Sequence, residues 1–262
     1  MRDHVIRDFW TSLIDTTPAR IALGRTGASL PTHEVLKFSM AHSRARDAVH
    51  TLFNRDQVAL EIQGLGFETI LVESAAPDRA SYLRRPDWGR KLSPSSRAHL
   101  ERLVFPTVDL AIVVADGLSA TAIHTQVVPF LAALKPWIAG SGWSTAPVVI
   151  ASQARVALGD EVGELLRART VILLVGERPG LSSPDSLGIY LTYGPHRLRN
   201  DGERNCISNV RPEGLTHDLA AFKLAWLVSE SFRRELTGVS LKDESDLYLL
   251  AGGRPPLELP LR

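Results

Sequence analysis

The chain has 262 residues, of which 44% are hydrophobic and 23% charged, so it is long and apolar enough for one large globular domain or two smaller ones. With 30 Lys and Arg residues against 29 Asp and Glu residues, it lacks the positive charge that binding to a nucleic-acid backbone usually needs. The single cysteine excludes an internal disulfide and indicates a reducing, cytoplasmic compartment, and no apolar run approaches the roughly 18 residues that cross a bilayer.

The N-terminal region, residues 1–104, is predicted to be rich in helices. The spacing of its apolar residues predicts three helices, over residues 4–14, 31–53 and 57–66. A strand is predicted over residues 67–74. The stretch from 75 to 96 is rich in Pro, Arg and Ser and is long for a bare loop. We therefore expect a functional loop there, or a segment that lies against a partner.

From about Asp109 the chain alternates between apolar strands and helices. The strands are expected over 109–115, 146–152, 170–177 and 188–194, and the helices over 119–138, 157–168 and 216–238. Fully apolar strands that alternate with helices predict a parallel sheet covered on both faces. The expected fold class is α/β, with a Rossmann-like, mainly parallel, three-layer domain over 105–240 and an irregular C-terminal tail over 241–262.

Ligands of open α/β sheets bind beyond the carboxyl ends of the strands. The sequence indicates three such ends. Asp116 and Gly117 follow the first strand, residues 152–156 with Arg155 and Val156 lie at the end of the second, and Gly176, Glu177 and Arg178 lie at the end of the third. The pair Glu177–Arg178 stands between a glycine and Pro179, a composition that fits a ligand-binding turn and equally fits an ordinary solvated turn. The pattern alone leaves both interpretations open.

No motif in the sequence predicts a complete catalytic site. A phosphate loop, a nucleophile elbow, a zinc-binding H-E-x-x-H and a cysteine pair are all missing. His42, Arg46 and His50 share one helix face, but the outer two lie about 12 Å apart along the axis, too far to share a metal ion. We interpret that face as polar surface or as an interface. Cys206 fits a small buried hydrophobe or a ligand contact.

Six segments in order resemble the light (small) subunit of ethanolamine ammonia-lyase over about residues 9–238. The segments are TPARIALGRTG, HSRARDAVH, RPDWGRKL, VADGLSATAIH, VGERPGL and NCISNV. The resemblance implies a role in the radical conversion of ethanolamine to acetaldehyde and ammonia, with adenosylcobalamin as the cofactor. It also implies a hetero-oligomer with a large TIM-barrel subunit that carries the catalytic residues, and a location in the cytoplasm or within a bacterial microcompartment.

The resemblance implies three contacts with the cofactor in this chain: Val156, Glu177 and Cys206. The sequence D-x-H-x-x-G, with which some proteins supply a histidine to the cobalt, is missing, so the cofactor is expected to keep its own base on the metal. No catalytic residue and no metal ligand is expected in this chain, and neither nucleic acid nor membrane is expected as a partner. The alternatives are a nucleotide-binding module and a purely structural interaction subunit.

Overall fold

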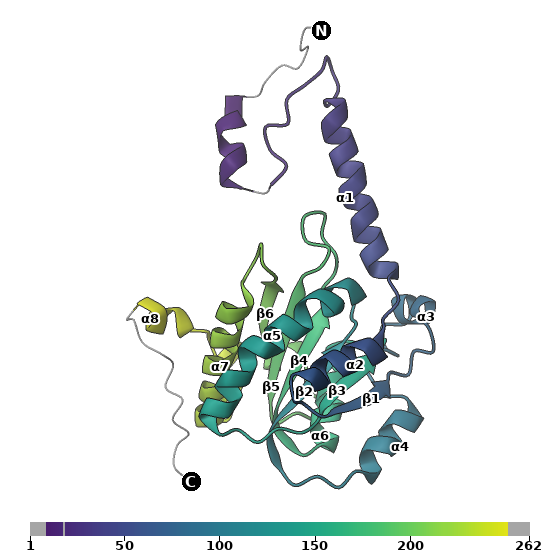
Figure 1. The fold of residues 1–262 in the computed structure, drawn as a ribbon, viewed down its shortest axis with the longest axis vertical. Helices are drawn as coiled ribbons and strands as arrows, with labels where there is room; N and C mark the ends of the chain where they lie inside the picture. Colours follow the sequence, from purple (N-terminus) through teal and green to yellow (C-terminus); the bar gives the residue numbers. More distant parts are fainter. Residues whose placement is uncertain (1–8, 18, 251–262) are drawn as a thin grey trace.

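A computed structural model describes residues 9–17 and 19–250, and its centre is a six-stranded sheet (Figure 1). The strands are β1 (Thr69–Glu73), β2 (Val108–Ala115), β3 (Val148–Ser152), β4 (Ala168–Gly176), β5 (Leu187–Tyr193) and β6 (Asn205–Val210). Their order across the sheet is β1-β3-β2-β4-β5-β6. The first four strands of this order run parallel, and β5 and β6 are antiparallel to their neighbours.

Helices cover both faces of the sheet and make the three predicted layers. One face packs against α2 (Arg55–Gly64), α5 (Ala120–Ser141) and α7 (His217–Arg234), and the other against α4 (Pro94–Arg102) and α6 (Leu158–Leu165). The strands between these layers are apolar on both faces, as β2 shows: Ile112 and Val114 pack toward α5, and Val113 and Ala115 pack toward α6. This two-sided burial explains why the strands have continuous apolar sequences.

The antiparallel arrangement of β4 and β5 follows from the short connection between them. Residues 177–186 join the two strands without a helix, and a parallel partner would need a crossover of a dozen or more residues. The start of β5 therefore lies beside the end of β4, with Gly176 paired to Leu187. The carboxyl edge of the parallel strands thus also receives the first residues of β5 and the last residues of β6.

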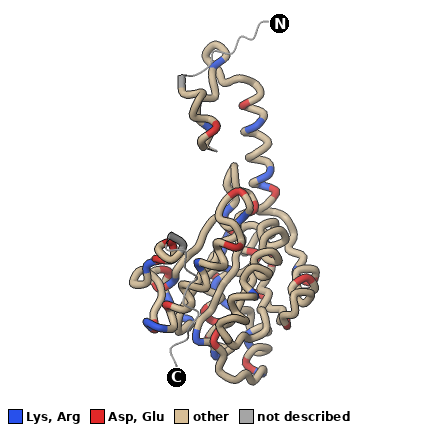
Figure 2. Tube along the Cα trace, turned by 60° about the vertical axis from the view of Figure 1, so that its left-hand side comes forward, with Lys and Arg blue, Asp and Glu red and all other residues tan. Residues whose placement is uncertain are grey.

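The N-terminal part projects from this body. Helix α1 (Thr32–His50) extends away from the sheet, and a short 3-10 helix, η1 (Phe9–Thr16), lies to one side of its first half (Figure 1). Residues of both charges occur along α1 (Figure 2), which also exposes large apolar side chains, among them Leu36 and Met40. No helix within residues 9–17 and 19–250 has the length and apolar character needed to span a bilayer.

Several predicted boundaries differ from the structure. The stretch 75–96 is not a bare loop, because it contains α3 (Arg79–Arg84) and the start of α4. Helix α7 ends at Arg234, four residues before Gly238, because Glu235 adopts a left-handed conformation (φ 55°). Gly238 instead packs against the backbone of residues 202–203. Within the expected irregular tail, Ser245–Leu250 forms α8, and residues 251–262 lie outside the described part.

Strand β1 joins the sheet through β3, although its sequence precedes the predicted α/β domain. The predicted helix over 4–14 begins outside the described residues, and its described part is the 3-10 helix η1. The sequence did not predict β6, a strand of six residues in which only Ile207 and Val210 are buried. The short 3-10 helices η2 (Asp201–Glu203) and η3 (Gly238–Ser240) complete the described elements.

Candidate functional site

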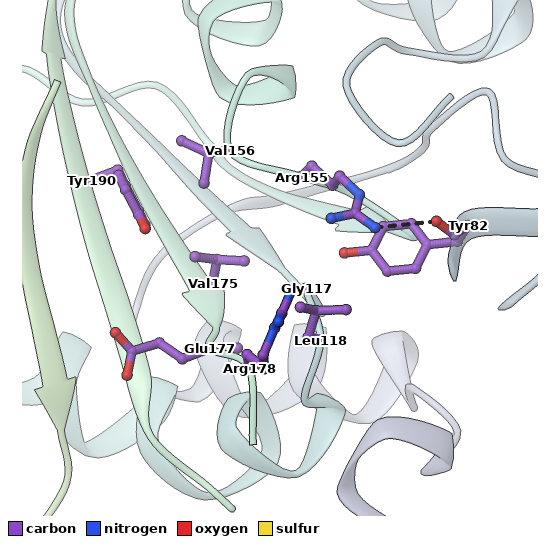
Figure 3. A pocket seen from close by; sticks show the side chains of 10 residues that line it. Tyr82, Gly117, Leu118, Arg155, Val156, Val175, Glu177, Arg178 and Tyr190 are labelled. Atoms are coloured by element: carbon purple, nitrogen blue, oxygen red, sulfur yellow. Dashed lines mark hydrogen bonds between the residues drawn. The ribbon is translucent and has the colours of Figure 1, made fainter. Parts of the chain in front are cut away.

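A cavity of about 430 Å³ lies at the carboxyl edge of the parallel strands. It is lined by Tyr82, Gly117, Leu118, Arg155, Val156, Val175, Gly176, Glu177, Arg178 and Tyr190 (Figure 3). These residues come from α3, from the loops after β2, β3 and β4, and from β5. The structure therefore brings together three strand ends that lie far apart in the sequence, as expected for a site in an open α/β sheet.

Two glycines allow the loops after β2 and β4 to touch. Gly117 has a left-handed backbone (φ 55°), and a side chain there would overlap with the carbonyl oxygen of Gly176. A side chain on Gly176 would overlap with the carbonyl oxygen of Ser119 and lie 2.6 Å from that of Asp116. The amide of Leu118 donates to the Gly176 carbonyl at 2.9 Å. The two glycines thus allow close contact between two loops of this chain, and both also line the cavity.

The Glu177 carboxylate is fixed at one side of the cavity by β5 and β6. Its Oε2 accepts a hydrogen bond from the amide of Asn209 at 3.1 Å, and its own amide donates to the carbonyl of Ser186 at 3.1 Å. The side chain lies over Gly188, where a Cβ would come within 3.1 Å of the Glu177 Cγ. Its Oε1 has no hydrogen-bond partner within the described residues, so the half-buried carboxylate keeps one oxygen free to accept.

Val156 and Tyr190 form an apolar part of the cavity wall together with Val175 (Figure 3). Val156 follows β3 and is half-buried, and Tyr190 packs from β5 against the helix α6 side of the core. Burial raises the pKa of the Tyr190 phenol above its ordinary value, so the ring stays neutral at physiological pH. The predicted contact Val156 therefore lines the same cavity as Glu177.

Cys206 lies beside this cavity and is not among its lining residues. It is exposed on β6 and pairs across the strands with Tyr190, so the thiol lies on the same face of the sheet. Its Sγ is 3.8 Å from the Oγ of Ser208. Local desolvation raises the pKa of the thiol, against the opposing effect of hydrogen bonding with Tyr190. The thiol is thus neutral at physiological pH and suited to packing rather than to nucleophilic attack.

The other side of the cavity contains a stack that sequence analysis missed. The Tyr82 ring is buried, and the guanidinium groups of Arg79 and Arg155 lie 4.9 Å and 4.6 Å from its centroid. Arg155 also donates to the carbonyl oxygen of Tyr82 at 3.3 Å (Figure 3). The only sequence signal for this stack was the unusual length of the segment that carries Arg79 and Tyr82.

Arg79 and Asp116 connect this stack to the strand ends. Arg79 Nη1 lies 3.3 Å from the buried Asp116 carboxylate and donates to the carbonyl of Gly117 at 2.7 Å. Asp116 also accepts from the amide of Ala154 at 3.1 Å, two residues before Val156. Burial raises the pKa of Asp116 to about 6, although the Arg79 guanidinium opposes this rise.

We expect Asp116→Asn to gain stability relative to the unsubstituted protein as the pH rises from about 4 to about 7. Between the ordinary pKa of 3.8 and the folded value of about 6, the folded chain holds a proton that the unfolded chain has lost. The free energy of unfolding of the unsubstituted protein therefore falls as the pH rises through this window, by about 1–3 kcal/mol. Asparagine does not titrate, so the variant escapes this loss.

Urea unfolding of both proteins at the two pH values measures this difference. The change with pH is compared between the two proteins, so that the titration of all other groups, which both proteins share, cancels in the difference. A stability difference between variant and unsubstituted protein that stays constant across the window, or that changes in the other direction, would contradict a raised pKa at Asp116.

A second cavity of about 310 Å³ continues the first along the sheet. It is lined by Arg90, Arg155, Val156, Ala157, Tyr190, Asp201 and Arg204, and three of these residues also line the first cavity. Among all residues that line the two cavities in the described structure, none is a histidine, serine or cysteine. The site therefore offers apolar surface, several guanidinium groups and the carboxylates of Glu177 and Asp201, a set of groups that can bind a ligand.

The polar helix face predicted on α1 lies away from these cavities. His42, Arg46 and His50 are all exposed. Within residues 9–17 and 19–250, no group of three or more His, Cys, Asp or Glu side chains is placed to hold a metal ion. The exposure of the three side chains fits polar surface, and a role of this face as an interface stays a prediction.

Comparisons with known proteins identify relatives along almost the whole chain. The sequence model of the family described as ethanolamine ammonia-lyase light chain matches residues 7–242. The chain is 53% identical over 244 residues to the ethanolamine ammonia-lyase small subunit of Pseudomonas putida, an alignment that covers 92% of this chain and 90% of that protein. The proteins of the same name from Pseudomonas syringae pv. tomato and Xanthomonas campestris pv. campestris are also 53% identical, over 92% and 93% of this chain and 85% and 91% of theirs.

Proposed function

The chain belongs to the family of ethanolamine ammonia-lyase light chains, and we propose that it binds adenosylcobalamin together with a large catalytic subunit. The complex would convert ethanolamine to acetaldehyde and ammonia. The observation that carries this proposal is the cavity at the carboxyl edge, which brings the predicted contacts Val156 and Glu177 together. Cys206 lies on the neighbouring strand β6, paired with the cavity residue Tyr190 and on the same face of the sheet.

The residues of the cavity fit one side of a corrin ring. Cobalamin carries neutral amide arms around its ring, and each arm offers two donors and one acceptor. The free Oε1 of Glu177 can accept from such an arm, while Val156 and Tyr190 offer apolar contact to the ring edge. The cavities of about 430 and 310 Å³ are at the small end for ligand sites. They can therefore cover one side of this large cofactor but cannot enclose it.

Because the cavities are too small to enclose the cofactor, their size supports the proposal that a second polypeptide covers the open side of the site. Helix α1 and the 3-10 helix η1 also expose large apolar side chains, with Leu36 64% and Trp10 58% accessible. Clusters of exposed apolar residues of this kind are typical of surfaces that contact another chain. We propose that the large subunit supplies the opposite wall of the cofactor site and the catalytic side chains, and that this chain is inactive without it.

The cofactor and this chain then have separate roles in the reaction. Adenosylcobalamin supplies the radical chemistry when bound. The residues of this chain hold and orient the cofactor and exclude water from one side of it. Since the sequence lacks D-x-H-x-x-G, we propose that the cofactor keeps its own base on the cobalt. We place the complex in the cytoplasm, with a bacterial microcompartment as the alternative.

Co-expression of this chain with the large subunit, followed by an assay of ammonia release from ethanolamine, tests the proposal. We expect release only when both chains and adenosylcobalamin are present. Copurification of the corrinoid with the complex, read from its absorption spectrum, separates this function from a purely structural role. Ammonia release by the large subunit alone at the rate of the complex would contradict the proposed requirement for this chain.

A further inference from the structure

Arg155 lines both cavities and has no acidic partner. Its side chain is half-buried, and its Nε is buried without any hydrogen-bond partner in the described structure. Its only side-chain hydrogen bond there runs to the carbonyl oxygen of Tyr82. Guanidinium groups that lose contact with water are normally paired with an anion or fully hydrogen-bonded. Arg155 therefore has unused binding capacity at the wall of the site.

The position of the Arg155 guanidinium is fixed by its surroundings. It lies over the ring of Tyr82, whose hydroxyl donates to the carbonyl of Ala154 at 3.3 Å. The amide of Arg155 donates to the carbonyl of Gly89 at 2.8 Å. A side chain on Gly89 would lie 3.1 Å from the Arg155 Cγ, so this glycine leaves room for the arginine stem. A charge held in this way costs little further ordering when it binds an anion.

The neighbouring charges leave this part of the wall positive. Arg204 is already paired with Asp160 and Asp201. Arg90 and Arg178 are exposed and have no ion pair with a described residue. The Glu177 carboxylate lies on the other side of the first cavity, away from Arg155 (Figure 3). Glu177 and the Arg178 that follows it thus lie at one end of the site, whereas the unpaired Arg155 and Arg90 line the second cavity at the other end. The one carboxylate of that second cavity, Asp201, is paired with Arg204.

From this asymmetry we infer that Arg155, assisted by Arg90 at the rim of the second cavity, binds the phosphodiester of the cofactor's nucleotide loop. The inference rests on the proposed function. The phosphodiester is the one permanently anionic group of adenosylcobalamin, whose other arms are neutral amides. A guanidinium matches phosphate oxygens through two parallel N–H donors. Arg155 would therefore orient the cofactor, with the nucleotide loop at its end of the site and an amide arm at Glu177.

A pair of cofactor analogues tests this assignment on the complex with the large subunit. Adenosylcobinamide methyl phosphate keeps the phosphodiester, and adenosylcobinamide lacks it, while neither carries the nucleotide base. The dissociation constants of both are measured by equilibrium dialysis, so no turnover is needed. We expect the unsubstituted complex to prefer the analogue with the phosphodiester by about 10-fold and Arg155→Met to lose that preference, as expected for one charge-assisted hydrogen bond.

Three further variants keep the result interpretable. Arg155→Lys retains the charge without the fork of donors and should keep part of the preference. Arg90→Met alters an exposed side chain, so it should fold normally and reduce the preference to a smaller, salt-dependent extent. Arg102→Met, an exposed arginine on α4 without an ion pair to a described residue, should leave both dissociation constants unchanged.

Several outcomes would overturn the inference. Equal weakening of both analogues by Arg155→Met would show that the arginine only shapes the wall. An unchanged preference would place the phosphodiester elsewhere. Weaker association of the subunits with an unchanged preference would assign Arg155 to a carboxylate of the partner. Competition by inorganic phosphate against both analogues equally would indicate a site for free phosphate. If adenosylcobalamin itself does not bind the unsubstituted complex, the proposed function fails, and the inference fails with it.

Discussion

Gly176→Ala should lower the free energy of unfolding by about 3 kcal/mol, at the upper end of the range for overpacking. The new Cβ would overlap with the carbonyl oxygen of Ser119 and lie 2.6 Å from that of Asp116. Both neighbours are backbone atoms in the loop after β2, so no side chain can move aside. Either the loop after β2 or the end of β4 must shift, and Glu177 shifts with it. Urea unfolding of the isolated chain measures the loss.

Gly64→Ala is the matched control for this substitution. Gly64 is the last residue of α2, and a Cβ at this position would meet no atom within 4 Å. Alanine is favoured over glycine in a helix by up to about 1 kcal/mol, so the control should be neutral or slightly more stable. If Gly176→Ala were as stable as Gly64→Ala, the close contact between the loops after β2 and β4 would be wrong.

Glu177→Ala should weaken the binding of adenosylcobalamin to the assembled complex by about 100-fold, because it removes a charge-assisted hydrogen bond in a partly desolvated site. The substitution also leaves the amide of Asn209 without its acceptor, so part of the loss reflects a looser end of β6. The fold of the core should survive, since the side chain is only half-buried. Equilibrium dialysis of the complex gives the dissociation constant directly.

Two variants separate charge from shape at this position. Glu177→Gln keeps one acceptor oxygen and the bond from Asn209, so it should lose less affinity than Glu177→Ala. Glu61→Ala removes an exposed carboxylate from α2, on the face of the sheet opposite the cavity, and should leave cofactor affinity unchanged. An unchanged affinity in Glu177→Ala would remove Glu177 from the site, whatever the activity of the complex.

The sheet's central strands could be predicted from the sequence because both of their faces are buried. Strands β2, β3 and β4 are almost entirely buried, and such strands have apolar runs that stand out against the rest of the chain. The direction of β5 could not be predicted in this way, since an apolar strand has the same composition whether it runs parallel or antiparallel. It depends instead on the short connection after β4. Strand β6 is half exposed and too short for a clear pattern.

Some residues of the site could be predicted from the strand pattern next to them in the sequence, whereas others depend on packing between distant segments. Val156 and Glu177 follow buried strands, so the rule for open α/β sheets predicted their position at the carboxyl edge. The selection of Cys206 came from the family resemblance, because its strand was not predicted. Tyr82 reaches the cavity from a distant segment, and the contacts of Tyr82 with Arg155 and of Arg79 with Asp116 depend on how α3 packs. Sequence spacing carries no information about that packing.

The central claim is that the carboxyl edge of this sheet forms one wall of a corrinoid site completed by the large subunit. A structure of the two-subunit complex with adenosylcobalamin, determined by electron cryomicroscopy, tests it most directly. The account predicts the corrin ring over Val156 and Tyr190, with an amide arm at the Glu177 carboxylate and Cys206 within contact distance of the ring edge. A corrin ring bound entirely within the large subunit, out of reach of Glu177 and Cys206, would contradict it.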